Sequence, residues 1–111
     1  MNANPYPWRD DPVVIVQDDS GGFIVVPSYK LAAAGDTLTF KFYDCDRLQV
    51  SERNRGRKLF GDIVTDKPNL LQVKILDDLK PGLYEYDAVC MIGSKPHKAK
   101  GGSPPGVIVD P

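Results

Sequence analysis

Metal-ligating side chains, long apolar runs and an excess of charge of one sign are all scarce in this sequence. Its 111 residues include one His and two Cys, which are too few for a four-ligand His/Cys zinc site. No apolar run approaches the ~18 residues that a membrane helix needs. The formal net charge of −1 argues against binding nucleic acid through the overall field of the protein. We therefore expect one soluble domain, with neither a membrane nor a sequence-specific nucleic acid as its partner.

The first eleven residues have the composition of an arm rather than of a folded element. Pro5 and Pro7 favour extended backbone, and Trp8 is the expected anchor. We predict an extended Pro-rich arm over residues 1–11 and a single domain over residues 12–111. Because no basic segment precedes an apolar one, we expect no signal peptide and a cytoplasmic protein. The alternative is a periplasmic or secreted protein whose leader has been removed. Self-association through the arm or an edge strand is also open.

Short β-branched and aromatic runs between Gly, Pro and Asp turns dominate the rest of the chain. In residues 37–43, Leu38, Phe40 and Phe42 alternate with polar residues, which is the period of a half-buried strand. We expect similar strands at 13–16, 23–26, 46–51, 69–76, 83–90 and 107–109, with a short one within 59–64 and loops at 52–58 and 92–106. About eight short strands with frequent turns predict an all-β fold, a Greek-key antiparallel β-sandwich.

Three segments of this pattern are similar to a known family. Residues 34–40 read Ala-Gly-Asp-Thr-Leu-Thr-Phe, residues 79–86 read Leu-Lys-Pro-Gly-Leu-Tyr-Glu-Tyr, and residues 106–109 read Gly-Val-Ile-Val. In this order and spacing they resemble the cupredoxins, the blue-copper β-sandwiches. The resemblance implies a Greek-key sandwich over most of residues 12–110. It also implies electron transfer for those members of the family that hold copper with two His, one Cys thiolate and usually a Met.

The copper ligands of that family are not matched at their positions. The place of the first His is taken by Leu48, and the place of the Cys by Ala88, with Cys90 two residues further on. His97 comes seven residues after Cys90 rather than within a few. The resemblance therefore implies a cupredoxin-like sandwich whose copper ligand set is lost or altered, and we expect no cofactor.

Four side chains are candidate soft-metal ligands: Cys45, Cys90, Met91 and His97. In a cupredoxin sandwich the strand ends that carry Cys45 and Cys90 face the same pole, so we expect the two residues to approach each other. They would stay thiols in a reducing cytosol or form a disulfide in a secreted protein. With His97 or Met91 they could instead hold copper. Cys90 and His97 could also form a nucleophile pair, but nothing supplies an orienting group or an oxyanion hole, so we expect no enzyme.

Basic side chains are concentrated in two predicted loops. Residues 47–58 contain five cationic residues against Glu52 alone, and residues 95–100 contain three lysines beside His97. The loop over residues 92–105 is longer than two strands need, so we expect it to bind a partner; an ordinary mixed-charge surface is the alternative. The predicted partner-binding residues are Arg53, Arg55, Arg57, Lys95, His97, Lys98 and Lys100.

The sequence as a whole predicts a binding or structural module. We expect it to be non-catalytic and metal-free, and to contact a protein or anionic partner through its loops. The alternative is a copper-binding electron-transfer protein with an altered Cys/His site.

Overall fold

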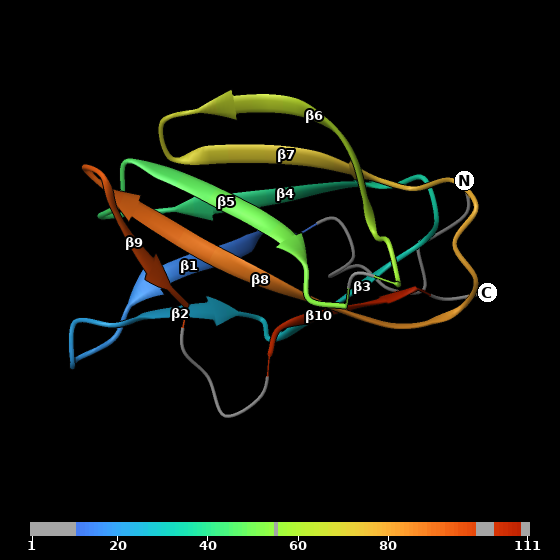
Figure 1. Ribbon diagram of the computed structural model, residues 1–111, viewed down its shortest axis with the longest axis horizontal. Helices are drawn as coiled ribbons and strands as arrows, with labels where there is room; N and C mark the ends of the chain where they lie inside the picture. Colours follow the sequence, from blue (N-terminus) through green and yellow to red (C-terminus); the bar gives the residue numbers. More distant parts are fainter. Residues whose placement is uncertain (1–10, 55, 100–103, 110–111) are drawn as a thin grey trace.

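The computed structural model describes residues 11–54, 56–99 and 104–109, and they form two β-sheets packed face to face (Figure 1). The strands are β1 (Val13–Gln17), β2 (Phe23–Val26), β3 (Tyr29–Ala32), β4 (Thr37–Phe42), β5 (Arg47–Glu52), β6 (Phe60–Lys67), β7 (Leu70–Ile75), β8 (Gly82–Ile92), β9 (Lys95–Lys98) and β10 (Gly106–Val109). Over these residues there is no helix that could cross a membrane. The all-β sandwich predicted from the sequence is confirmed. Residues 1–10 of the predicted arm lie outside the described residues.

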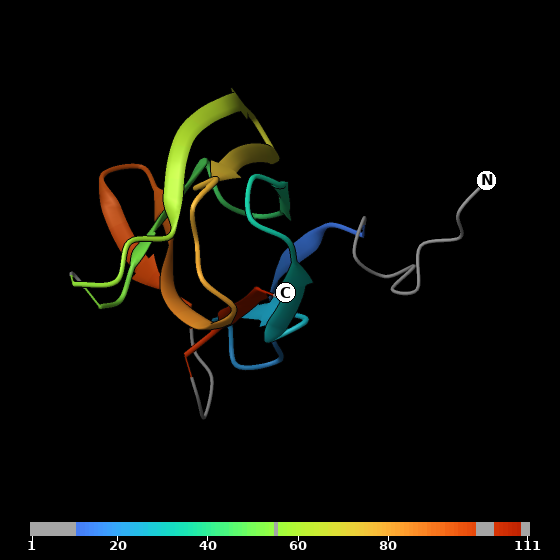
Figure 2. The ribbon, with the colours of Figure 1, turned by 90° about the vertical axis from the view of Figure 1, so that its right-hand side faces the viewer.

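The strand order shows how the chain passes between the two sheets. One sheet has the order β2-β1-β4-β7-β6 and the other β3-β10-β8-β5, with β9 added to the far end of β8. β2 and β3 follow each other in the chain but belong to different sheets. In the end view of Figure 2, β8 and β9 (orange) lie on one side of the molecule and β1 (blue) on the other. The pairs β1–β4 and β3–β10 are parallel, so the sheets are mixed rather than wholly antiparallel.

The core lies between the sheets, on the faces that the alternation predicts. Tyr84, Tyr86, Ala88 and Cys90 are buried along β8, and Phe42 ends the buried row of β4. Burying each large apolar side chain contributes about 1.5–3 kcal/mol, so these rows fix the register of both sheets. The buried apolar set also contains Val13, Ile15, Phe23, Val25, Ala32, Leu38, Phe40, Leu48, Leu59, Leu71, Val73, Ile75, Val107 and Val109.

Tyr86 stands at the centre of this core. Its ring packs edge-on against Phe40 and Phe60, with ring centroids 5.8 Å apart in both pairs. The side chain is fully buried, and its hydroxyl has no hydrogen-bond partner among the described residues. Burial raises the pKa of the Tyr86 phenol, because the charged form would lose its hydration.

A glycine turn sets the start of β4. Gly35 has a φ of +85°, a conformation that other residues adopt only with strain. Its N–H donates to the carbonyl of Leu76, while the carboxylate of Asp36 accepts from the N–H of Ala33 at 2.9 Å. The Gly-Asp pair of the sequence therefore joins the entry of β4 to the end of β7.

Two segments differ from the sequence-based expectation. Residues 92–105, expected as a loop, contain β9, because β8 continues to Ile92 and turns back through Gly93. The β9 sequence Lys-Pro-His-Lys has no apolar alternation and pairs with β8 through its backbone, so no side-chain pattern predicted it. Residues 29–32, for which the sequence predicts no strand, form β3 beside β10.

The open edges of the two sheets meet on one side of the sandwich. β5 ends one sheet and β6 ends the other. Arg47 of β5 forms an ion pair with Asp66 of β6 at 3.6 Å. The register shifts within β6 and its exposed Ile63 and Val64 mark it as an irregular edge strand.

Candidate functional site

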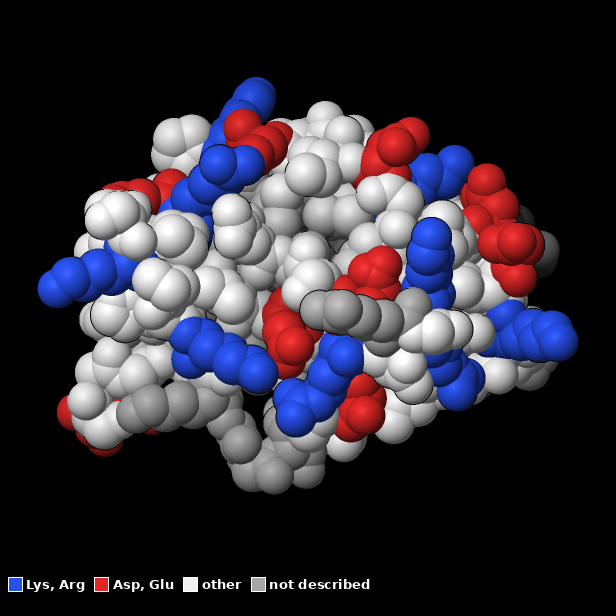
Figure 3. All heavy atoms as spheres, viewed as in Figure 1, with Lys and Arg blue, Asp and Glu red and all other residues white. Residues whose placement is uncertain are grey.

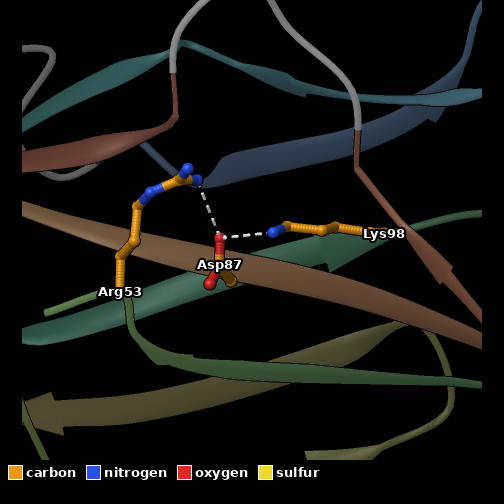
Figure 4. Close-up of polar contacts among 3 residues, drawn as sticks. All are labelled: Arg53, Asp87 and Lys98. Atoms are coloured by element: carbon orange, nitrogen blue, oxygen red, sulfur yellow. Dashed lines mark hydrogen bonds and ion pairs between the residues drawn. The ribbon is translucent and has the colours of Figure 1, made fainter. Parts of the chain in front are cut away.

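Two cations from distant parts of the sequence converge on one carboxylate. Arg53 Nη1 donates to Asp87 Oδ1 at 3.3 Å, and Lys98 Nζ lies 3.3 Å from the same oxygen. Figure 4 shows both side chains pointing toward Asp87 from opposite sides. This convergence joins the predicted basic segments 52–58 and 92–105 on the outer face of β8.

Strand pairing explains why these three side chains meet. Asp87 lies between Tyr86 and Ala88, which are buried, so the pleat turns Asp87 to the outer face. β5 places Ser51 opposite Asp87, and the N–H of Arg53 donates to the carbonyl of Glu85. On the other side, β9 pairs with the same strand. Arg53 and Lys98 thus flank Asp87 from the two neighbouring strands, within reach for long side chains.

The charges at this site do not balance. A surface hollow of about 560 Å³ beside Asp87 is lined by Ser51, Glu52, Arg53, Lys58 and Asp87. The side chains of Arg53 and Lys98 are 46% and 61% exposed, against 23% for Asp87. We call Arg53, Lys58 and Lys98 the cationic cluster. Arg53 and Lys58 balance Glu52 and Asp87 in the lining of the hollow. Lys98, which pairs with Asp87 from β9, adds one further positive charge beside it. Figure 3 shows blue groups on either side of a red one in the lower half of this face.

Arg57, which is exposed, holds the segment that carries the cluster against the buried ring of Tyr84. Its guanidinium stacks on the ring of Tyr84, 4.4 Å from the ring centroid, and a cation over an aromatic face is held electrostatically. A Cβ at Gly82 would come within 2.7 Å of Arg57 Nη2, so the glycine leaves room for this stack. Tyr84 is itself fixed because its hydroxyl donates to the carbonyl of Lys80. The stack pins the connection that carries Arg53 and Lys58 to the start of β8.

Two other predicted partner-binding residues, Lys95 and His97, lie apart from the cluster. Lys95 pairs with Ile92 at the tip of the β8–β9 hairpin. His97 lies opposite Cys90 and its ring meets Phe23 edge-on, 6.2 Å between centroids. Arg55 and Lys100 lie outside the described residues. Of the seven predicted residues, the structure brings Arg53 and Lys98 together.

Asp87 and Lys58 are not among the site residues that the sequence predicts. Asp87 lies on the outward face of a strand whose inward face has the pattern Tyr-x-Tyr-x-Ala-x-Cys. The sequence does show a carboxylate on the exposed face of a strand that lies between two basic segments, and this pattern could have indicated Asp87. Its neighbours in space depend on the register of β5 and β9 with β8, which the sequence alone does not give.

The predicted soft-metal ligands form a smaller cluster at the far end of β8. The Cys90 and Cys45 thiols are within hydrogen-bonding reach, and Cys45 Sγ donates to the carbonyl of Arg47 at 3.2 Å. Burial raises the pKa of the Cys90 thiol, and the hydrogen bond and charge of Cys45 raise it further. Met91 follows Cys90 on β8 and therefore points to the opposite face.

These ligands do not fit the copper centre that the resemblance implies. The chain contains one His, whereas a blue-copper centre uses two. Across residues 11–54, 56–99 and 104–109, no three His, Cys, Asp or Glu side chains form a group that could hold a metal ion. The structure instead presents Cys45 and Cys90 as free thiols in contact.

Comparison with protein-family models finds no match for this chain, and comparison with curated proteins finds none either.

Proposed function

We propose that this chain is a cupredoxin-like, non-catalytic binding module that contacts an acidic protein segment through the cationic cluster. The observation that carries this proposal is the sharing of one Asp87 oxygen by Arg53 and Lys98, each at 3.3 Å. The three cations of the cluster stand beside two carboxylates, those of Asp87 and Glu52. A third carboxylate, from a partner, would complete the charge balance.

The cupredoxin-like part of the proposal is supported by where the three similar segments lie. They form the entry and body of β4, the first half of β8, and β10, which pairs with β8. The contact between Cys45, just after β4, and Cys90, near the end of β8, places these two strand ends at one pole. The two free thiols support a cytoplasmic location, where thiols stay reduced.

The exposure of the cationic cluster determines what kind of binding to expect. Two unit charges 4 Å apart interact by about 4 kcal/mol near a protein surface, before desolvation. Since Arg53 and Lys98 are about half exposed, most of this attraction is screened. At physiological salt, charges separated by more than about 8 Å hardly interact. We therefore expect contact with a partner to be weak, fast and salt-dependent.

Charge reversal tests the proposal. The probe is a fluorescein-labelled oligoglutamate peptide, titrated with protein at low ionic strength and followed by fluorescence anisotropy. Arg53→Glu combined with Lys98→Glu should weaken binding at least about tenfold, because two positive charges of the cluster are replaced by two negative charges that repel the peptide. Raising the salt concentration should weaken the wild-type complex in parallel.

A matched control separates the cluster from overall charge. Lys41→Glu combined with Lys67→Glu makes the same charge change on β4 and β6, in the other sheet. Because its charge changes lie further from the cluster, this control should lose several-fold less affinity than the cluster variant. Equal losses in the two double variants would reduce the effect to net charge and overturn the proposal.

A copper-binding electron-transfer protein is the second candidate. It is favoured by the Cys45–Cys90 contact and by the pairing of His97 with Cys90 across β9 and β8. An absorption spectrum and a metal analysis of the purified protein decide it. An intense visible charge-transfer band with stoichiometric copper would support this candidate, and a spectrum without such a band after copper addition would remove it.

A further inference from the structure

The two cysteines of the chain come from segments far apart in sequence and meet at one end of β8. Cys45 lies in the connection between β4 and β5, and Cys90 lies on β8, three residues beyond the outward-facing Asp87. Their thiols are within hydrogen-bonding reach. The chain has two cysteines, so each cysteine has the other as its neighbour and no third cysteine competes.

Backbone hydrogen bonds hold the two cysteines in this position. The N–H of Asp46 donates to the carbonyl of Met91 at 2.8 Å, and the N–H of Gly93 donates to the carboxylate of Asp46 at 2.7 Å. The residue after each cysteine is therefore joined to the other segment. Moving Cys45 away from Cys90 would break these bonds, so the two segments stay side by side, as the short span of a disulfide requires.

The two thiols differ in their access to solvent. Cys90 is fully buried, between Leu48 on β5 and His97 on β9. Cys45 is half-buried at the surface of the same pole. A small disulfide in solution can therefore reach Cys45 first. Burial also raises the pKa of Cys90, which makes that thiol a poor nucleophile toward a disulfide in solution.

We propose that Cys45 and Cys90 are an oxidisable pair, in which Cys45 reacts first with a low-molecular-weight disulfide and Cys90 resolves it. The Cys45 thiolate attacks one sulfur of oxidised glutathione, forms a mixed disulfide and releases one glutathione thiolate. Cys90 then loses its proton, attacks the Cys45 sulfur and displaces the second glutathione thiolate. Two thiols of the protein become one disulfide, and one glutathione disulfide becomes two glutathione thiols. This chemistry does not depend on the cationic cluster.

The experiment incubates the purified full-length protein with oxidised glutathione. Thiols are then counted under denaturing conditions and the intact mass is measured. We expect both thiols to disappear while the mass falls by that of two hydrogen atoms, with no glutathione retained. Survival of both thiols, a stable glutathione adduct on the wild type, or a disulfide-linked dimer would each overturn the proposal.

Two variants assign the roles. Cys90→Ala should accumulate a stable glutathione adduct on Cys45, because the resolving thiol is gone. Cys45→Ser should lose its remaining thiol at least about tenfold more slowly than the wild type, because Cys90 is buried. Cys45 is half-buried, so the serine variant folds even if the alanine at the buried site does not. Oxidation of Cys45→Ser at the wild-type rate would contradict the order of the two steps.

Discussion

Tyr86 shows at the scale of one residue how this core combines close packing with an unsatisfied polar group. Its ring contacts Phe40 and Phe60, so its burial stabilises the fold. Its hydroxyl is buried without a partner among the described residues, and a buried hydroxyl that makes no hydrogen bond costs about 1–3 kcal/mol. The alternation of the sequence predicts that Tyr86 points inward. It does not predict that the hydroxyl finds no acceptor there, because that depends on which side chains surround it.

Replacing Tyr86 by phenylalanine should therefore stabilise the protein. Tyr86→Phe keeps the ring contacts and removes the unpaired hydroxyl, so we expect the free energy of unfolding to rise by about 1 kcal/mol. Urea unfolding of wild type and variant at neutral pH measures the difference. A loss of about 1 kcal/mol or more would show that the hydroxyl makes a stabilising hydrogen bond.

At the scale of elements, the turn before β4 is fixed by its glycine more than by its length. Gly35 has a φ of +85°, and a Cβ there would lie 2.8 Å from Asp77 Oδ1. Because an L-residue in this conformation costs about 1–2 kcal/mol, Gly35→Ala should lower the free energy of unfolding by about that amount.

Gly56→Ala is the matched control for this turn. Gly56 does not have a positive φ, and a Cβ there would meet Asn54 Oδ1 at 3.5 Å, an ordinary contact. We expect its free energy of unfolding to stay within about 0.5 kcal/mol of the wild type or to rise slightly. Equal effects of the two substitutions in denaturant titrations would mean that the turn at Gly35 is not strained for alanine.

At the scale of the whole molecule, the buried Tyr86 hydroxyl and Cys90 thiol make the free energy of unfolding fall as the pH rises into the alkaline range. The pKa values of Tyr86 and Cys90 are raised from ordinary values of 10.0 and 9.0, so both groups stay protonated in the folded state while the unfolded chain ionises. Their contribution to the free energy of unfolding is complete below about pH 9 and is lost as the pH rises above that value. In that range each group should lower the free energy of unfolding by about 1.4 kcal/mol per pH unit.

Urea titrations between about pH 8 and about pH 11, with a reductant present, test this dependence. The wild type should lose stability steeply across that range. Cys90→Ala combined with Tyr86→Phe should show a shallower fall, because neither buried acid is left to titrate. Identical slopes would assign the alkaline loss to other groups.

The sequence predicts the layers of the molecule better than its pairings. Period-two alternation identifies the inward rows of β4, β7 and β8, because burial of those side chains is what forms the sheets. β9 was not predicted, because it is held by backbone hydrogen bonds to β8 and not by the burial of an apolar face. The meeting of Arg53 with Lys98 was not predicted for a related reason. Arg53 directly follows β5 and Lys98 ends β9, on either side of β8, and only the strand register brings them to Asp87.

Mapping a bound acidic peptide on the protein tests the proposed function most directly. In a ¹H–¹⁵N correlation spectrum of the full-length protein, titration with an oligoglutamate peptide should shift the amides of Ser51, Arg53, Asp87 and Lys98, and added salt should reverse the shifts. The amides of β1, β4 and β7, in the other sheet, should stay unchanged. Shifts confined to that other sheet, or no shifts at low salt, would contradict the assignment of the cationic cluster as the binding surface.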